Sequence, residues 1–458
     1  YDLCDEYGIL VWTEFWQTGD TKLPDDRELH RSNVSDTIRR IRNHPSQCFY
    51  VSANERNEKT IVPIKDIVEK LHPGCDYLEA SEIGGIHDGS PYLVENPMFH
   101  YEDSASQRGS RINGLCPEYG TATIPTVDCL REMMDEKDLW PINKVVWDYL
   151  DGGGFHRMTS NFDRGVNHYG PSSNIEEYAM KGQAFGGLCF RSIWECWNAN
   201  KFDYGDRFCT GLLFWYHNSP NKQVCGRLYD WSLEPTSALY FSQDAHEPLH
   251  AQMDFLKNTV AVNNEYPREF NGKLTARVID FNMREISRKT IPVRVGPEAV
   301  ANGLMTLEFP QNLTPVHFIK LELANINGQP VSDTFYWRSN KAYKPKRTWT
   351  GPQLEGFEDL AKLPKVKPAS KVVWKDDAKG QVAEVTVRNT SKSLAFMVWL
   401  RLQDQATGKP VRPAFYDDNF FSMLPGEQRV IRIQHDGKTD KTQVVVDGWN
   451  IEKQTHHN

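Results

Sequence analysis

The sequence predicts an α/β domain that is followed by two all-β domains. Up to about residue 250, short apolar runs alternate with stretches of helical periodicity, which is typical of a parallel α/β fold. From about residue 265, segments such as 274–280 and 316–323 alternate apolar and polar residues with a period of two, and turn signals separate them. Short strands with this spacing indicate β-sandwiches.

The α/β block contains six expected strands. Each is a short run rich in β-branched and aromatic residues: 8–15, 47–52, 76–81, 97–101, 112–116 and 211–216. Helices are expected between several of these strands. Ser35 is the expected N-cap of a helix that ends before His44, and further helices are expected over 64–71, 126–134 and 173–199.

The β part divides at a segment rich in lysine and proline, which has the composition of a linker. The expected order is an α/β domain over 1–260, a sandwich over 261–345, a linker over 346–368 and a second sandwich over 369–458. One strand of the second sandwich is expected to place alternate apolar side chains on a single face: Leu394, Phe396, Val398, Leu400 and Leu402.

Composition limits the classes of function. The chain has 458 residues, enough for about three domains. Its net charge of −8 argues against nucleic acid as a partner. No apolar run reaches the roughly 20 residues that a membrane-spanning helix needs. Aromatic residues make up 12% of the chain and include 13 tryptophans, which suit both large cores and surfaces that stack on sugars.

The compartment stays open from the sequence. The nine cysteines form no CxxC pair with zinc or redox spacing. N-glycosylation sequons begin at Asn33, Asn312 and Asn389, a number close to chance for this length. A secreted, periplasmic, vacuolar or lysosomal location is favoured over the cytoplasm.

Two of the expected strands end in a carboxylate. Asn54 and Glu55 follow the apolar run 48–51, and Glu118 follows the run 112–116. Because parallel α/β proteins carry their chemistry at the carboxyl ends of strands, these residues are catalytic candidates. Alternatively, Asn54 and Glu55 merely cap the next helix. The two glutamates are 63 residues apart, the spacing expected between strands 4 and 7 of a (β/α)8 barrel.

Four motifs in the same order carry a resemblance to glycoside hydrolase family 2. They are YGILVWTEFW at 7–16, NHPS at 43–46 with the pair Asn54-Glu55, PEYG at 117–120 and GLLFW at 211–215. Within this family, the chain resembles the exo-β-glucosaminidase and endo-β-mannosidase branch. The resemblance implies the C-terminal part of a TIM barrel, with strands 3 to 8 visible, followed by two immunoglobulin-like sandwiches.

The same resemblance implies a retaining β-glycoside hydrolase that cleaves β-mannosides or β-glucosaminides, with no cofactor or metal. Glu55 then matches the acid/base and Glu118 the nucleophile, and Asn54 would hydrogen-bond the 2-substituent of the sugar. Such chemistry needs two carboxyl groups about 5–5.5 Å apart. Glu58 belongs to a second Asn-Glu pair and rivals Glu55, but Glu55 is favoured because it directly follows the apolar run.

Aromatic residues near the strand ends are expected to bind the substrate. Trp215 follows the last strand, where it either packs on the barrel top or, as the resemblance implies, forms the floor of the −1 subsite. Trp12, Glu14 and Trp16 cluster at the end of the first strand and could contact the sugar. Glu14 could instead belong to a structural ion pair.

A glycine-rich loop supplies three more expected substrate contacts, His87, Asp88 and Tyr92. The alternative for this loop is a metal site that uses His87 and Asp88. A metal is disfavoured because no further ligand has the right spacing.

Two further interpretations of the whole chain remain open. It could bind glycans without cleaving them, or it could be an assembly subunit of a larger glycosidase. An eight-stranded barrel needs two strands more than the six seen here. Tyr1 also begins inside an expected helix. We therefore expect a missing N-terminal part before Tyr1, on this chain or on a partner chain, and an oligosaccharide as the substrate.

Overall fold

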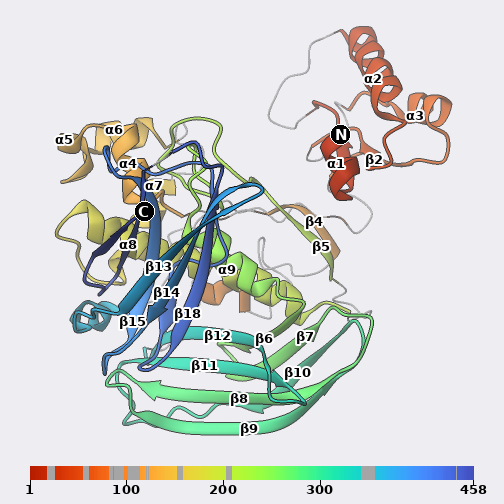
Figure 1. The fold of residues 1–458 in the computed structure, drawn as a ribbon. Coiled ribbons are helices and arrows are strands. Elements are labelled where there is room, and N and C mark those ends of the chain that lie inside the picture. Colours follow the sequence, from red (N-terminus) through yellow and green to blue (C-terminus); the bar gives the residue numbers. More distant parts are fainter. Residues whose placement is uncertain are drawn as a thin grey trace. The chain divides into compact units, whose positions relative to one another are not determined.

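The computed structural model describes residues 1–17, 26–54, 61–81, 86, 97–101, 114–119, 121, 123–151, 158–202, 209–341, 356–439 and 441–458. The chain forms two compact units (Figure 1). The first consists of Tyr1–Ser90, Asn113–Tyr119 and Gly205–Phe214, and the second of Pro91–Ile112, Gly120–Tyr204 and Trp215–Asn458. No helix among the described residues is long and apolar enough to cross a bilayer.

The first unit is built on parallel strands. Strands β1 (Val11–Glu14), β2 (Gln47–Val51) and β3 (Asp76–Leu78) form one parallel sheet in this order. Strands β4 (Gly114–Tyr119) and β5 (Cys209–Phe214) form a second parallel pair. These strands overlap five of the six expected runs. A closed (β/α)8 barrel stays a prediction.

Three helices accompany the sheet of β1 to β3: α1 (Asp2–Tyr7), α2 (Arg27–Ile41) and α3 (Lys65–Leu71). One face of α2 is apolar because Val34, Ile38 and Ile41 recur at helical spacing. These side chains pack with Phe15 of the segment after β1 and with Tyr50 of β2. The core of this unit therefore lies between the helices and one face of the sheet.

Helix α2 begins earlier than the sequence suggested. Asp26 is its N-cap and accepts a hydrogen bond from the backbone N–H of Leu29 at 2.9 Å. The prediction that Ser35 caps this helix is wrong, because Ser35 lies inside it and its hydroxyl donates to the carbonyl of Arg31. A serine within a helix can satisfy its hydroxyl this way, so residue type alone does not mark a helix start.

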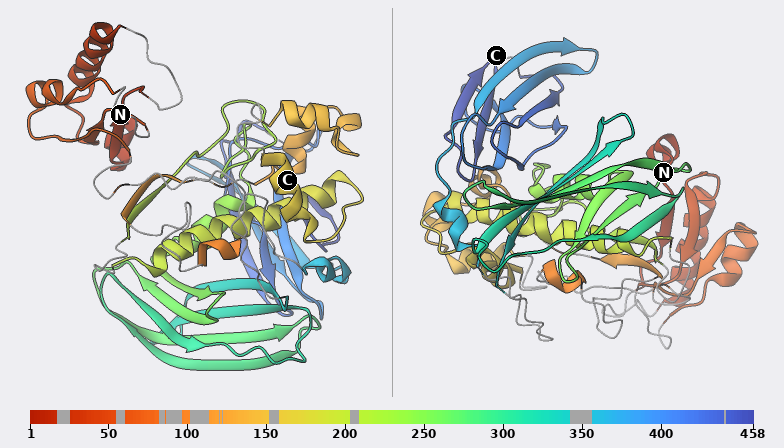
Figure 2. Two further views of the ribbon diagram at one scale, coloured as in Figure 1. Left: turned by 180° about the vertical axis from the view of Figure 1, so that it is seen from behind. Right: turned by 90° about the horizontal axis from the view of Figure 1, so that it is seen from below.

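The second unit is organised around α8 (Ile175–Ala199). Of its 25 residues, 20 are buried. Around it lie the shorter helices α4 (Val127–Met133), α5 (Glu136–Leu139), α6 (Lys144–Tyr149), α7 (Met158–Asn167) and α9 (Ser237–Ala245). Figure 2 shows α8 running along the first β-sandwich.

Residues 97–101 are not the strand that their apolar character predicted. Pro97–Tyr101 forms the 3-10 helix η1, which packs against α8. Proline lacks a backbone donor and suits the first turn of a helix. The hydroxyl of Tyr101 donates to Glu195 of α8 at 3.0 Å, so the packing partner decides the conformation here.

The first sandwich has a three-stranded and a four-stranded antiparallel sheet. The smaller sheet has the order β10 (Ala299–Thr306), β7 (Thr259–Asn264), β6 (Leu249–Asp254). The larger has the order β12 (Pro330–Ser339), β11 (Val316–Asn325), β8 (Phe270–Asp280), β9 (Glu285–Val295). The expected strands over 274–280 and 316–323 are thus confirmed within β8 and β11.

The second sandwich has two four-stranded sheets. One has the order β13 (Ala369–Asp377), β14 (Gly380–Arg388), β18 (Gln428–His435), β16 (Ala414–Tyr416). The other has the order β17 (Phe421–Met423), β15 (Ala395–Asp404), β19 (Thr442–Gly448), β20 (Gln454–His457).

The prediction of a single apolar face along β15 is wrong. The register shifts between Ala395 and Val398, and Met397 has a φ of 50°. This bulge turns the strand, because one extra residue exchanges the two faces. Phe396 therefore packs with the helices, whereas Val398 and the following alternate residues face the interior of the sandwich.

An aromatic cluster joins the two sandwiches to the helical layer. Trp337 of β12 donates its indole N–H to the hydroxyl of Tyr169 at 3.0 Å and packs edge-on against Phe396, with ring centroids 5.0 Å apart. Tyr169 also stacks on Phe357, next to the 3-10 helix η3 (Glu358–Lys362). The described part of the expected linker is therefore packed into the core.

We expect that Gly182→Ala destabilises the protein. A Cβ on Gly182 would lie 2.1 Å from the Cγ2 atom of buried Ile124, which cannot move aside in a packed core. The free energy of unfolding should fall by about 1–3 kcal/mol, measured by urea unfolding. The control is Gly296→Ala, where the new Cβ meets its nearest neighbour at 3.8 Å. Equal midpoints for the two variants would show that α8 is less tightly packed than described.

Candidate active site

The carboxyl ends of β1, β2 and β3 are tied together three residues beyond each strand, at Gln17, Asn54 and Ser81. The backbone N–H of Asn54 donates to the carbonyl of Gln17 at 2.7 Å. The hydroxyl of Ser81 donates to Oδ1 of Asn54 at 3.3 Å. Asn54, the expected contact to the sugar 2-substituent, is therefore held from both neighbouring strands.

Gln17 is a positioning residue that the sequence did not single out. Its side-chain nitrogen donates to the carbonyl of Ser52 at 3.0 Å and to the hydroxyl of Ser52 at 3.1 Å. Its side-chain oxygen accepts from the backbone N–H of Val62 at 2.7 Å. Gln17 is 2% exposed, so these bonds form away from water. Ser52 and Val62 flank the segment that follows Asn54. Gln17 therefore links the residues at the two ends of this segment.

Trp12, Glu14 and Trp16 occupy alternate positions along β1 and its extension. Their neighbours Thr13, Phe15 and Gln17 are buried, whereas Glu14 is exposed and Trp16 is 50% exposed. The structure thus places the three expected substrate contacts along one side of the strand. Trp12 packs on Phe49 of β2 with ring centroids 4.6 Å apart, and Trp16 packs edge-on against His30 at 5.7 Å.

Glu118 lies near the carboxyl end of β4. Its side chain is half-buried, and the neighbouring Cys116 is fully buried. Strand β4 pairs in parallel with β5, and the register is irregular between Cys116 and Tyr119. Pro117 supplies no backbone donor, which accounts for an interrupted ladder at this point. A carboxylate at this place meets the expectation for a residue at a strand tip.

Trp215 directly follows β5 and belongs to the second unit. It is half-buried, and its ring lies edge-on to Tyr216 with centroids 4.4 Å apart. The guanidinium of Arg227 lies 5.6 Å from the centre of the Trp215 ring and 4.6 Å from that of Tyr216. Arg227 in turn donates to the carbonyl of Thr121 at 2.6 Å, so the rings are held against a fixed cation.

Several expected site residues lie outside the described residues. These are the proposed acid/base Glu55, its rival Glu58, and the loop residues His87, Asp88 and Tyr92. Their roles stay predictions.

One group among the described residues has the ligand atoms for a metal, Asp2, Asp5 and His44, all within 4.8 Å. The carboxylate of Asp5 lies 2.6 Å from Nδ1 of His44 and accepts from the backbone N–H of Ser46 at 2.9 Å. Hydrogen bonding from Ser46 and His44 lowers the pKa of Asp5 to about 2. These contacts fix α1 to the turn before β2.

Comparisons with known proteins find relatives over nearly the whole chain. A family model described as the exo-β-D-glucosaminidase Ig-fold domain matches residues 347–451. The chain is 25% identical to an exo-β-D-glucosaminidase of Amycolatopsis orientalis, over 99% of this chain and 48% of the relative. It is 23% identical to a mannosylglycoprotein endo-β-mannosidase of Lilium longiflorum, over 99% of this chain and 58% of the relative. The chain spans about half the length of the curated relatives it matches.

Solved structures share the fold. The exo-chitosanase CsxA of Amycolatopsis orientalis matches with a TM-score of 0.89 at 24% identity, covering 100% of this chain and 58% of that chain. The β-D-mannosidase of Dictyoglomus thermophilum matches with a TM-score of 0.73 at 17% identity, covering 99% and 54%.

These matches indicate the branch of glycoside hydrolase family 2 that contains exo-β-glucosaminidases and β-mannosidases, and the chain is similar to a C-terminal part of these relatives. The expected family is confirmed, and so is an immunoglobulin-like fold in the C-terminal part of the chain.

We expect that Gln17→Ala loosens the segment around Asn54. The change removes the side-chain oxygen that accepts from the Val62 amide, and it removes the donor to the carbonyl and hydroxyl of Ser52. Loss of these bonds should cost about 2–4 kcal/mol locally. Hydrogen exchange of the Val62 amide should quicken at least about tenfold. The control is Gln329→Ala in an exposed turn of the other unit. Unchanged exchange at Val62 would contradict the positioning role of Gln17.

Proposed function

We propose that this chain carries the catalytic residues of a retaining β-glycoside hydrolase acting on β-mannosides or β-glucosaminides. The observation that carries the proposal is the match over 99% of the chain to a protein named exo-β-D-glucosaminidase. The two glutamates and the aromatic residues at the strand ends supply the residue types that this chemistry needs. The proposed domain order is a partial TIM barrel, a first sandwich that starts at β6 (Leu249–Asp254) instead of residue 261, a linker over 346–368 and a sandwich over 369–458.

The proposed mechanism is a double displacement. Glu118 attacks the anomeric carbon and forms a glycosyl ester, while Glu55 protonates the leaving oxygen. Glu55 then removes a proton from water, which releases the sugar with retained configuration. Two nearby carboxyl groups favour this division of roles, because the charge of one raises the pKa of the other.

The remaining contacts orient the sugar. Asn54 binds the 2-substituent, and its anchoring by Gln17 and Ser81 restricts its side chain before the sugar arrives. Trp215 offers an aromatic face for stacking on the sugar, fixed by the Arg227 cation. Trp12, Glu14 and Trp16, with His87, Asp88 and Tyr92, complete the proposed subsites.

The two candidate substrates are β-mannosides and β-glucosaminides. The motif over 12–20 and the Asn54-Glu55 pair resemble the mannosidase side, whereas several relatives are named exo-β-D-glucosaminidase. A non-catalytic carbohydrate-binding or assembly role is the alternative function. The whole protein is proposed to include an N-terminal part, on this chain or a partner, because relatives extend over about twice this length.

We expect that Glu118→Gln abolishes hydrolysis of both 4-nitrophenyl β-D-mannoside and 4-nitrophenyl β-D-glucosaminide in the native protein. An amide cannot form the glycosyl ester, so kcat should fall roughly 10⁴-fold or more. The control is Glu69→Gln, an exposed glutamate of α3 that lies 3.8 Å from Lys65. If Glu118→Gln keeps a tenth of the wild-type rate, the nucleophile is elsewhere.

Glu118→Ala with added azide separates the two carboxylate roles. With a nitrophenyl substrate, azide should replace the missing nucleophile and yield the α-glycosyl azide, because it attacks from the face that Glu118 occupied. A β-glycosyl azide would instead assign Glu118 as the acid/base. No hydrolysis of either sugar by the wild-type native protein would favour the non-catalytic role.

A further inference from the structure

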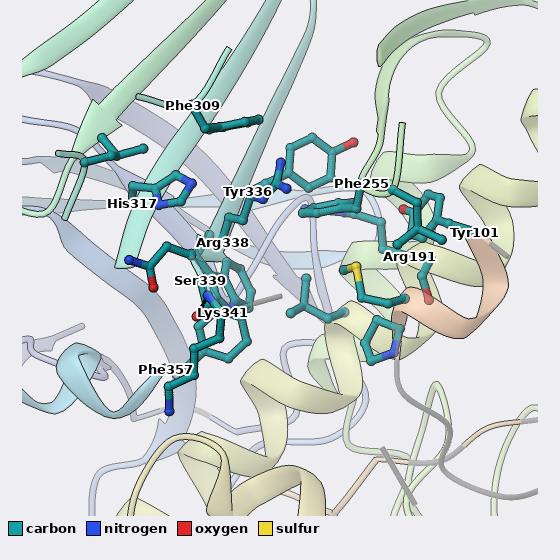
Figure 3. A pocket seen from close by; sticks show the side chains of 18 of the residues that line it. Tyr101, Arg191, Phe255, Phe309, His317, Tyr336, Arg338, Ser339, Lys341 and Phe357 are labelled. Atoms are coloured by element: carbon teal, nitrogen blue, oxygen red, sulfur yellow. Dashed lines mark hydrogen bonds between the residues drawn. The ribbon is translucent and has the colours of Figure 1, made fainter. Parts of the chain in front are cut away.

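The second unit contains a cavity of about 580 Å³ between the first sandwich and the helical layer (Figure 3). Small-molecule sites typically have volumes of about 300–1,000 Å³. Rings from separate segments of the chain form its walls: Tyr101, Phe255, Phe309, Trp337 and Phe357. Its lining residues in the described parts of the chain belong to the second unit, and none of these is a proposed active-site residue.

Arg338 places an unmatched positive charge in the wall of this cavity. Its guanidinium lies 4.1 Å from the centre of the Phe309 ring and donates to Oδ1 of Asn258 at 2.5 Å. No lining residue is acidic, and Arg338 has no ion pair with any carboxylate in the described parts of the chain. Burial lowers the pKa of Arg338 to about 10, so the group remains charged at neutral pH.

The other cations that line the cavity have carboxylate partners. Arg191 donates to Asp244 at 2.7 Å, and Lys341 lies 3.8 Å from Glu358. An anion that entered the cavity would therefore gain most from Arg338. Arg338 is half-buried, so its charge is partly removed from water, and a bound anion would offset that desolvation.

His317 lies beside Arg338 and offers a second polar group with which a ligand could form a hydrogen bond. The two residues are direct partners across β11 and β12, so their side chains leave the same face of the sheet. Nδ1 of His317 lies 3.4 Å from the carbonyl of Thr314, which can only accept, so this nitrogen carries the proton. Nε2 is then an acceptor, and it has no hydrogen-bond partner among the described residues although His317 is only 1% exposed.

His317 is neutral at physiological pH. Burial and the neighbouring Arg338 cation lower its pKa to about 4. Two groups therefore lie side by side in the wall. The Arg338 guanidinium can pair with an anion, and the neutral Nε2 of His317 can accept from an O–H or N–H donor. The rest of the described lining combines apolar and aromatic side chains with four neutral polar residues and the two paired cations, namely Ser192, Gln311, Ser339, Asn340, Arg191 and Lys341.

We propose that this cavity is a second binding site, which takes a small 2-hydroxy carboxylate with an aromatic body. The carboxylate pairs with Arg338, the adjacent hydroxyl donates to Nε2 of His317, and the aromatic body packs against Phe309 and Phe255. A β-mannoside carries no charge, and a β-glucosaminide carries a cationic amine at neutral pH. Neither supplies the anion, so the ligand differs from the proposed substrate.

The test is calorimetric titration of the whole chain at pH 7 with three matched probes. 3-Phenyllactate has the carboxylate and the hydroxyl, 3-phenylpropionate lacks the hydroxyl, and 3-phenylpropionamide lacks the charge. We expect one site per chain, with affinity falling at each step and at least about tenfold weaker binding of the amide than of phenyllactate. Arg338→Gln should weaken phenyllactate binding at least about tenfold and remove the preference for the acid over the amide.

Two further variants test whether the weaker binding expected for Arg338→Gln comes from the lost charge in the cavity and not from misfolding. Arg294→Gln makes the same charge change at an exposed position outside the cavity and should leave binding unchanged. Leu256→Trp fills the rim, where Leu256 is 37% exposed, and should block all three probes. Equal binding of acid and amide, equal loss in Arg294→Gln and Arg338→Gln, or no saturable binding up to about 10 mM would each overturn the proposal.

Discussion

The second unit depends on one buried carboxylate, Glu195 of α8. It is fully buried and accepts hydrogen bonds from the hydroxyls of Tyr336 at 2.7 Å and Tyr101 at 3.0 Å, and it lies 3.2 Å from Nε2 of His250. Burial alone would lower the pKa of His250, but hydrogen bonds with Glu195 and Glu247 raise it to about 9. A protonated His250 therefore offsets the buried negative charge. Moving any of these partners away would leave the buried charge of Glu195 less well paired. Because an unpaired buried charge costs several kcal/mol, the partners are held in place.

The partners of Glu195 come from η1, β6 and β12, so one carboxylate fixes three segments against α8. Two of these partners, Tyr101 and Tyr336, also line the cavity that contains Arg338. The hydrogen bonds of Tyr101 and Tyr336 with Glu195 thus fix the positions of these two rings in the cavity wall. A site with walls fixed in this way loses little conformational entropy on binding a ligand.

Charged contacts fix the second sandwich to the helices. Arg412 donates to Glu234 at 2.9 Å and to Glu132 at 3.0 Å, and Arg401 donates to Asp128 at 3.1 Å. Burial raises the pKa of Glu234 to about 7, although the Arg412 cation opposes this shift. Largely buried arginine pairs of this kind orient domains, because the planar guanidinium donors accept few geometries.

In the first unit, the buried side-chain amide of Gln17 connects separate segments, as the carboxylate of Glu195 does in the second unit. Gln17 satisfies groups on both sides of the segment after Asn54 without introducing a charge. This choice is consistent with the proposed pair of catalytic carboxylates, because a further charge nearby would shift the pKa of both.

The sequence by itself determined the elements whose signal is local. The helices expected over 126–134 and 173–199 and the alternation over 274–280 and 316–323 depend on neighbours along the chain, and the structure has them as α4, α8, β8 and β11. The ordered motifs also determined the family. The placement of Glu118 at a strand tip agrees with the expectation, whereas Glu55 lies outside the described residues.

Tertiary structure decided what depends on distant partners. Residues 97–101 are apolar enough for a strand, but packing on α8 makes them a 3-10 helix. The bulge at Met397 depends on the partner strands of β15, and it reverses the faces that alternation predicted. Gln17 and the cavity beside Arg338 had no sequence signal. Gln17 bonds to Ser52 and Val62, which are 35 and 45 residues away, and the cavity brings Tyr101 together with Tyr336. Periodicity records which face of an element is apolar, but it does not record which element covers that face.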